Sequence, residues 1–246
     1  MPAHDRPACR RALAFLLLAV GAVVAGGAPF RAEAEAEPAR RPKQEFVAPA
    51  PGSYRLQVIQ QAPDGEVIDT DRHAYRLERY LTGRITLLSF MYTYCVDPIA
   101  CPLAFDTFRI LRARLLEAPN LARRVRFVSL SFDPVNDTPD AMRNYAGKLA
   151  DPSSALRWHF LTTRSVAALS PIVADLGQDV ALQLDARGQP TRLYDHLLKI
   201  FLIDERGRVR EIYTTAFLLP EVMLNDIRTL ATERQATRNE ARLEPR

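Results

Sequence analysis

A nearly continuous apolar run at residues 85–91 (ITLLSFM) constrains the fold of this chain more than any other segment. Seven residues are too few for a free-standing helix, and an unbroken apolar run favours a β-strand that is buried on both faces. Residues 125–132 (VRFVSLSF) and residues 157–162 (RWHFLT) predict two further strands. Strands of this kind belong to sheets with helices on both sides, so the run predicts an α/β fold.

Helical patterns separate the predicted strands. Between residues 102 and 117, apolar residues recur at steps of four, three and four, and Pro102 suits the first turn of a helix. The segment 137–140 (DTPD) has the capping residue, proline and acid that mark a helix start, here running towards Leu149. Residues 165–176 predict a shorter helix that ends at Gly177. Strand and helix therefore alternate along the chain.

The C-terminal part departs from this alternation. Residues 198–204 and 209–213 flank a turn and predict a β-hairpin, and residues 220–230 predict a last helix. We therefore expect a central mixed β-sheet flanked by helices, with a C-terminal β-hairpin and helix. Residues 54–80 predict a β-rich extension at the N-terminal side of this domain.

The first residues have the pattern of an export signal. Three arginines precede an apolar run at residues 12–25, and small residues follow it. Residues 1–34 are therefore predicted to be a signal peptide, or an N-terminal membrane anchor if they are not cleaved. Either outcome predicts a protein in the periplasm or at the extracytoplasmic face of the membrane. We expect a flexible linker at 35–53, one domain at 54–231 and a polar tail at 232–246 that frays.

Composition excludes some partners. The 33 basic residues barely exceed the 29 acidic ones, no block of Lys or Arg occurs, and one Trp leaves little for base stacking. We therefore expect no nucleic-acid partner.

Two cysteines lie where the first buried strand gives way to a helix. Cys9 falls in the leader, so the exported domain contains only Cys95 and Cys101. A six-residue separation would place them out of phase on a regular helix, but Asp97 and Pro98 favour a turn that lets the two thiols converge. Such a pair can form a redox-active or structural disulfide, or hold a soft metal.

A metal centre needs a further ligand, and His196 is the best-placed histidine. His4 is lost with the leader, and His73 lies in the poorly patterned extension. His159 alternates along a strand, where a surface or half-buried position is expected. His196 directly precedes the strand at 198–204, at the rim of a sheet whose neighbouring strand can carry the cysteines. Two thiolates and one imidazole suit cuprous copper.

Several motifs in order resemble the Sco/SenC family of thioredoxin-like copper proteins. FMYTYC at 90–95 with Cys101–Pro102 resembles the family's cysteine motif, and SFDPVNDTP at 131–139 resembles its Ser-x-Asp-Pro signature. WHFLT at 158–162 and YDHLLKIFLIDERG at 194–207 match two further segments. The resemblance implies a thioredoxin-like fold, with Cys95, Cys101 and His196 at the positions of the copper ligands. Asp133 and Asp137 also match family positions, but helix capping and turn formation suffice to explain them.

The resemblance also implies a role and a partner. Family members deliver copper to the CuA centre of cytochrome c oxidase, or reduce the cysteines of that centre, so the recipient here would be the CuA-bearing subunit or another electron-transfer protein. One feature departs from the family: five residues separate the cysteines where the pattern has three. The pair could therefore act instead as a thiol-disulfide oxidoreductase with little or no copper, which leaves open whether the protein is an enzyme.

Two weaker alternatives remain. Peroxide reduction would need an arginine and a hydroxyl beside a nucleophilic cysteine, and Arg109 and Thr93 do not have matching spacing. The cysteines could also form an inert structural disulfide in a module that binds a partner.

Overall fold

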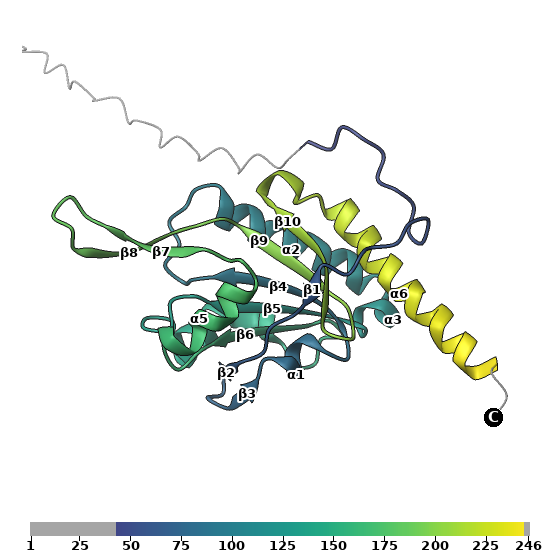
Figure 1. The fold of residues 1–246 in the computed structure, drawn as a ribbon, viewed down its shortest axis with the longest axis horizontal. Coiled ribbons are helices and arrows are strands. Elements are labelled where there is room, and N and C mark those ends of the chain that lie inside the picture. Colours follow the sequence, from purple (N-terminus) through teal and green to yellow (C-terminus); the bar gives the residue numbers. More distant parts are fainter. Residues whose placement is uncertain (1–42, 244–246) are drawn as a thin grey trace, which may run out of the picture. The chain divides into compact units, whose positions relative to one another are not determined.

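The computed structural model describes residues 43–243. The predicted signal peptide or anchor at residues 1–34 lies outside the described residues. None of the helices within the described range is both long enough and apolar enough to span a membrane. In chain order the elements, most of which Figure 1 labels, are β1 (Gln60–Gln61), β2 (Glu66–Asp69), β3 (Ala74–Arg76), α1 (Glu78–Leu81), β4 (Ile85–Met91), α2 (Ala100–Leu116), α3 (Pro119–Ala122), β5 (Val125–Ser131), α4 (Pro139–Ala146), η1 (Gly147–Ala150), β6 (Arg157–Thr162), α5 (Val166–Asp175), β7 (Val180–Leu184), β8 (Pro190–His196), β9 (Lys199–Ile203), β10 (Arg208–Thr214), η2 (Thr215–Phe217) and α6 (Pro220–Leu243).

A mixed sheet forms the centre of the fold. Its strand order is β1-β10-β9-β4-β5-β6-β2-β3. The three predicted strands β4, β5 and β6 are neighbours and run parallel, while β9 and β10 form the predicted antiparallel hairpin beside β4. The expected central mixed sheet, flanked by helices and ending in a hairpin and helix, is confirmed.

Both faces of the sheet are buried because apolar side chains of β4 and β5 point alternately to two separate cores. Ile85 and Leu87 of β4 pack with side chains of α2, α4 and α6 on one face. Leu88 and Phe90 pack with α1 and α5 on the other. All but the last residue of β4 are buried, which explains why its sequence is almost uninterruptedly apolar.

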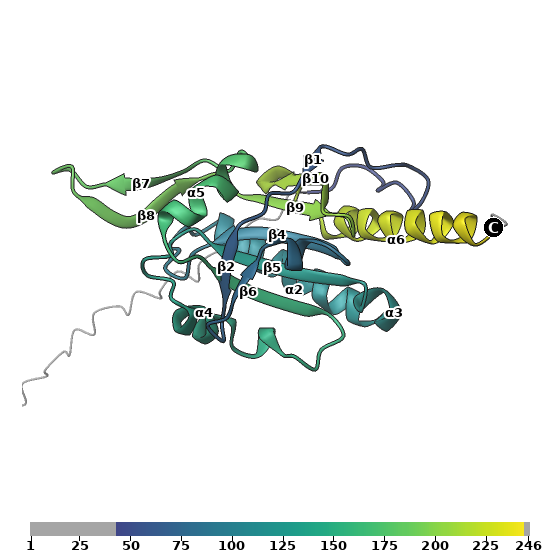
Figure 2. The ribbon, with the colours of Figure 1, turned by 60° about the horizontal axis from the view of Figure 1, so that its bottom comes forward.

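A second, two-stranded sheet was not predicted. Strands β7 and β8 pair antiparallel and extend beyond the main sheet in both views (Figures 1 and 2). Val180 pairs with His196, so the hairpin ends next to the start of β9. This hairpin, and not a loop, therefore carries His196.

The two ends of the described chain also differ from expectation. The last helix continues to Leu243, whereas a fraying polar tail was expected from residue 232. Residues within the expected linker contact this helix: the Gly52 N–H donates to Thr229 Oγ1 at 3.0 Å, and the Asn225 amide donates to the Pro49 carbonyl at 3.0 Å. Ordered contacts thus begin before Tyr54, because α6 offers polar side chains to the incoming backbone.

Candidate functional site

The cysteines lie in the loop that joins β4 to α2. Cys95 follows the end of β4 by four residues, and Cys101 is the second residue of α2. Between them, Asp97 Oδ1 accepts hydrogen bonds from the backbone N–H groups of Ile99 and Ala100, each at 2.7 Å. These bonds satisfy two amides at the start of the helix. The predicted turn at Asp97 is therefore present, and it brings the chain back towards Cys95.

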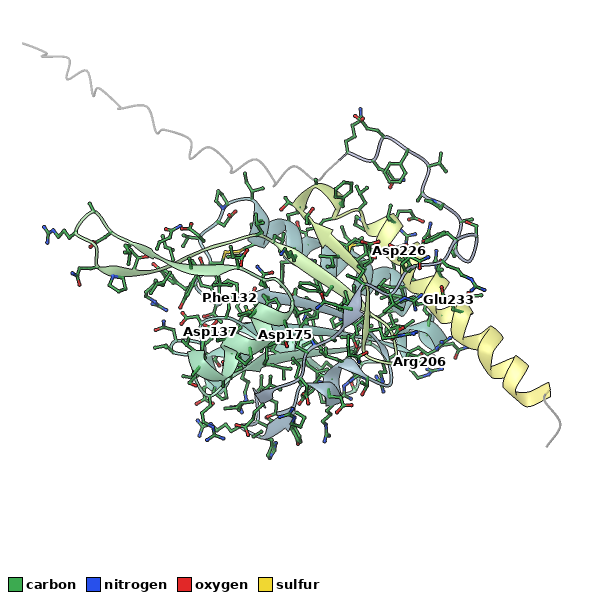
Figure 3. All side chains as sticks on the ribbon, in the orientation of Figure 1. Phe132, Asp137, Asp175, Arg206, Asp226 and Glu233 are labelled. Atoms are coloured by element: carbon green, nitrogen blue, oxygen red, sulfur yellow. A yellow bond between two sulfur atoms is a disulfide. The ribbon has the colours of Figure 1, made fainter. Side chains whose placement is uncertain are left out.

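Cys95 and Cys101 form a disulfide, with their Cα atoms 6.6 Å apart. Figure 3 shows the sulfur–sulfur bond near one end of the sheet. Both cysteines are half-buried, whereas four of the five residues between them are exposed. The convergence predicted from the turn is confirmed: a five-residue spacing does not separate the sulfur atoms, because the extra residues bulge towards solvent.

A pocket of about 50 Å³ lies beside this disulfide, and His196 lines it together with Cys95 and Cys101. The imidazole is 4.7 Å from the Phe132 ring and 6.3 Å from the Tyr92 ring, measured between centroids. Burial lowers the pKa of His196, although a hydrogen bond with the backbone of Leu197 and the charges of Asp97 and Asp195 oppose the shift. A neutral imidazole is the form that binds metals.

Strand β8 contacts the cysteine loop through alternate residues. The Arg192 guanidinium lies 4.4 Å from the centre of the Tyr94 ring, and the rings of Tyr194 and Tyr92 are 5.3 Å apart. His196 follows Arg192 and Tyr194 along β8 at the same spacing of two residues. Since side chains alternate along a strand, all three lie on one face of β8. The hairpin therefore positions His196, and the signal that the sequence offers for it is the turn at 185–188, where the Gly188 N–H donates to the Asp185 carbonyl and Gly188 has a positive φ.

Asp137 holds the residues that precede Cys95. Its carboxylate accepts hydrogen bonds from the Thr93 hydroxyl at 2.5 Å, from the Thr93 N–H at 3.1 Å, and from the Ser131 hydroxyl at 2.5 Å. Asp137 is only 1% exposed, and burial raises its pKa despite these bonds. The helix cap is Thr138, whose side chain accepts from Ala141. Capping thus does not explain Asp137, which instead fixes the cysteine loop to the end of β5.

Asp133 supports the same region from the other side. Its carboxylate accepts hydrogen bonds from the side chain of Asn136 at 2.8 and 3.1 Å, and it also hydrogen-bonds the Tyr194 hydroxyl of β8. The carboxylate thereby links the loop after β5 to the hairpin. Turn formation explains only the part of this role that involves Asn136.

The remaining candidate residues lie elsewhere or have other contacts. His73 is exposed and near Asp69, and His159 is half-buried, as expected. Arg109 is exposed and pairs with Asp106, while the Thr93 hydroxyl is bound to Asp137, so the two do not form a peroxide-reducing arrangement. In the described part of the chain, no three His, Cys, Asp or Glu side chains are arranged to hold a metal ion.

Comparison with known proteins agrees with the architecture of this region. The chain is 24% identical over 131 residues to mitochondrial protein SCO2 of Saccharomyces cerevisiae, which covers 53% of this chain and 40% of the yeast protein. It thus spans less than half the length of that relative. The structure of a SCO1/SenC family lipoprotein from Bacillus anthracis is 23% identical, with a TM-score of 0.59, over 72% of this chain and 99% of that one. This likeness confirms the predicted fold class.

A copper-bound structure is also similar. ScoI of Bradyrhizobium japonicum, with copper bound, is 25% identical with a TM-score of 0.53, over 68% of this chain and 97% of that one. The model of the SCO1/SenC family matches residues 66–232. That range includes the cysteine loop, the Asp137 contacts and the hairpin with His196. The chain described here therefore belongs to the SCO1/SenC family.

Proposed function

We propose that this protein carries copper as cargo, with Cys95, Cys101 and His196 as its ligands. The observation that supports this most directly is that Cys95, Cys101 and His196 line one pocket, although the cysteines and the histidine come from separate parts of the chain. Thiolate sulfur and imidazole nitrogen are ligands that cuprous copper prefers. ScoI of Bradyrhizobium japonicum, a relative of similar fold, is a copper-bound protein.

Copper loading requires reduction of the disulfide. In this proposal a dithiol reductant attacks the Cys95–Cys101 bond, leaves two thiols and becomes a disulfide itself, and binding of the metal then releases the thiol protons. The start of α2 favours the thiolate form at Cys101, because backbone N–H groups there carry partial positive charge. The lowered pKa of His196 keeps its imidazole unprotonated over a wider pH range. In this proposal the disulfide-bonded pair cannot bind copper, and its reduction produces the form that can.

The proposed recipient is the CuA centre of cytochrome c oxidase, or a related electron-transfer protein of the cell envelope. The protein would either transfer copper to that centre or reduce its cysteines before the metal is inserted. In this proposal residues 1–34 direct export and tether or release the domain at 54–231, which acts outside the cytoplasm. The exposed apolar residues beside the disulfide, Tyr94, Val96 and Ile99, are available to contact such a protein.

A copper titration tests the ligand set. Reduced wild-type protein is expected to bind about one equivalent of copper, with absorption bands from thiolate-to-metal charge transfer. Cys95→Ala, Cys101→Ala and His196→Ala should each weaken binding by at least about a hundredfold, because loss of a ligand costs no less than loss of a group that only orients a ligand. His73→Ala removes an exposed histidine far along the sequence and serves as the matched control. Unchanged affinity in His196→Ala would exclude the three-ligand site.

A thiol-disulfide oxidoreductase is the second candidate, and the disulfide itself favours it. In this reaction the reduced pair attacks a substrate disulfide, and the products are the Cys95–Cys101 disulfide and a substrate dithiol. Turnover should disappear with either cysteine variant and persist in His196→Ala. A metal carrier instead loses copper binding in all three variants and shows no turnover of disulfides in any of them, so the same variants distinguish the two functions.

A further inference from the structure

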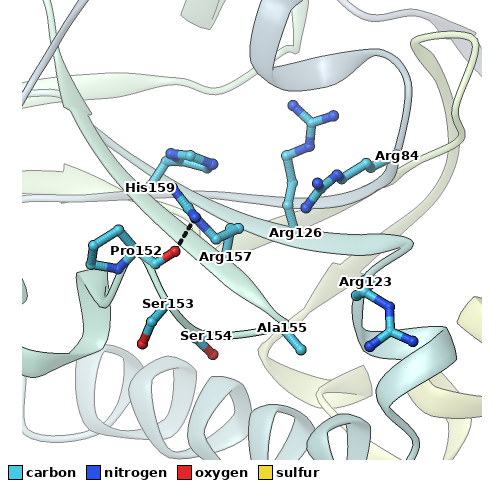
Figure 4. A pocket seen from close by; sticks show the side chains of 9 residues that line it. All are labelled: Arg84, Arg123, Arg126, Pro152, Ser153, Ser154, Ala155, Arg157 and His159. Carbon is cyan, nitrogen blue, oxygen red and sulfur yellow. Dashed lines mark hydrogen bonds between the residues drawn. The ribbon is translucent and has the colours of Figure 1, made fainter.

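A basic pocket lies at the end of the sheet opposite the cysteines. Its volume is about 600 Å³, and it is formed where β4, β5 and β6 begin, whereas Cys95 follows the far end of β4. Figure 4 shows the side chains that line it, namely Arg84, Arg123, Arg126, Pro152, Ser153, Ser154, Ala155, Arg157 and His159. Strand register explains the gathering, because Arg126 is directly opposite Arg157 in the parallel pair of β5 and β6.

The charge of this pocket is not neutralised. Four of its nine lining residues are arginines and none is acidic. The Arg157 guanidinium donates to the Pro152 carbonyl, and that of Arg123 to the amide oxygen of Asn120, so both have uncharged acceptors. Within residues 43–243, none of the four forms an ion pair with a carboxylate, and Arg84 makes no side-chain hydrogen bond. Four arginines therefore contribute to one lining that contains no carboxylate.

Arg126 is the buried element of this site. Arg126 is only 8% exposed. The two terminal nitrogens of its guanidinium donate to the carbonyls of Arg79 and Thr82, near the end of α1. Its Nε is buried and lacks a partner. Burial and the neighbouring charge of Arg84 lower the pKa of Arg126 to about 10. Buried polar atoms without a partner are rare in folded proteins, so the hydrogen bonding of Arg126 within the described residues is incomplete.

We propose that this pocket binds a phosphate-bearing ligand. Guanidinium groups match the oxygen atoms of phosphate in pairs of parallel hydrogen bonds, and several arginines around one pocket suit a multiply charged anion better than a single carboxylate. The phosphate belongs either to a soluble anion or to the headgroup of an anionic lipid. The His159 imidazole and the hydroxyl groups of Ser153 and Ser154 add hydrogen-bonding groups to the same lining.

Titration calorimetry with inorganic pyrophosphate tests the soluble form. The full-length, metal-free protein is used at constant ionic strength, so that general screening does not change. Saturable binding is expected, and Arg84→Gln and Arg157→Gln should each weaken it at least about tenfold, as loss of a charge-assisted hydrogen bond does. Arg187→Gln removes an exposed arginine of the β7–β8 turn and should leave binding unchanged. The Nε–H resonance of Arg126 should shift during the titration of wild-type protein.

Vesicle sedimentation tests the lipid form with the same variants. Vesicles of phosphatidylcholine, with and without phosphatidylglycerol, are compared, since only the latter adds anionic phosphate. Extra sedimentation that requires Arg84 and Arg157 but not Arg187 assigns the pocket to a lipid headgroup, and binding of pyrophosphate alone assigns it to a soluble anion. The proposal is overturned if neither probe binds in a manner that depends on Arg84 and Arg157.

Discussion

Single buried carboxylates determine much of the geometry around the cysteines. Asp137 accepts three hydrogen bonds from Thr93 and Ser131 and therefore connects the segment before Cys95 to the end of β5. The sequence motif around it resembles a helix start, and Thr138 does cap α4. The role of the Asp137 carboxylate could not be predicted from the sequence, because its partner Thr93 lies 44 residues away along the chain.

Replacing Asp137 with Ala is expected to lower the free energy of unfolding by about 2 kcal/mol, because two hydroxyl groups and one amide lose their acceptor. Reduction of the Cys95–Cys101 disulfide by dithiothreitol should also become faster, since the loop is held less firmly. Urea denaturation and a thiol-release assay measure the two effects. Asp140→Ala, an exposed carboxylate in α4, is the control and should change neither by much. Equal effects in the two variants would contradict the assignment.

His159 should make stability depend on pH. Burial, followed by the charges of Arg126, Arg157 and Arg84, lowers its pKa to about 4, while Asp69 opposes the shift. The imidazole is therefore protonated below pH about 6.5 in the unfolded chain, but only below pH about 4 in the folded protein. Acidification between these two values destabilises the fold by up to about 3 kcal/mol. His159→Gln should remove this part of the pH dependence. Parallel stability curves for wild type and variant across that range would refute it.

At the scale of elements, the main strands follow from sequence and the second hairpin does not. Residues 85–91 and 157–162 were predicted with the bounds that β4 and β6 have. The first is a nearly continuous apolar run, whereas the second alternates Arg157 and His159 with apolar neighbours. Strands β7 and β8 are largely exposed, so their residues carry little apolar periodicity. Their structure depends on contacts with the cysteine loop, chiefly Arg192 on Tyr94 and Tyr194 on Tyr92.

Arg192→Ala should loosen this hairpin with little loss of global stability. An exposed cation–π contact contributes about 0.5–1 kcal/mol, so the unfolding midpoint should barely move. Amide hydrogen exchange over residues 190–196 should accelerate, and copper affinity of the reduced protein should fall because His196 is held less firmly. Arg187→Ala, at the turn of the same hairpin, is the matched control. If both variants exchange at the same rate, the contact with Tyr94 does not position the strand.

At the scale of the whole molecule, the disulfide is a local cross-link in a fold that has its own apolar cores. The bond joins residues only six apart, while the two apolar clusters extend over both faces of the sheet. The fold class and the meeting of Cys95 with Cys101 were predictable, since each rests on local patterns. The contacts of Asp137 and the basic pocket were not, because they arise from strand order and register, which bring together residues distant along the chain.

Reduction of the disulfide is therefore expected to leave the domain folded. Chain entropy for a loop of this size predicts a loss of about 2 kcal/mol on reduction. Urea denaturation with and without reductant should show one cooperative transition in each case, at a lower midpoint when reduced. Cys95→Ala should match the reduced protein and no longer respond to reductant. Unfolding on reduction would contradict a carrier that must remain folded in both redox states.

Because β4, β5 and β6 run parallel, the two ends of the sheet differ in the groups that they carry. The basic pocket lies where these strands begin, and the cysteine loop follows where β4 ends. Seven residues at the rise of an extended strand separate the two ends by about 20 Å. A protein that binds phosphate through the basic pocket would thus hold Cys95 and Cys101 at the opposite end, one strand length away from the bound phosphate and accessible to a partner protein.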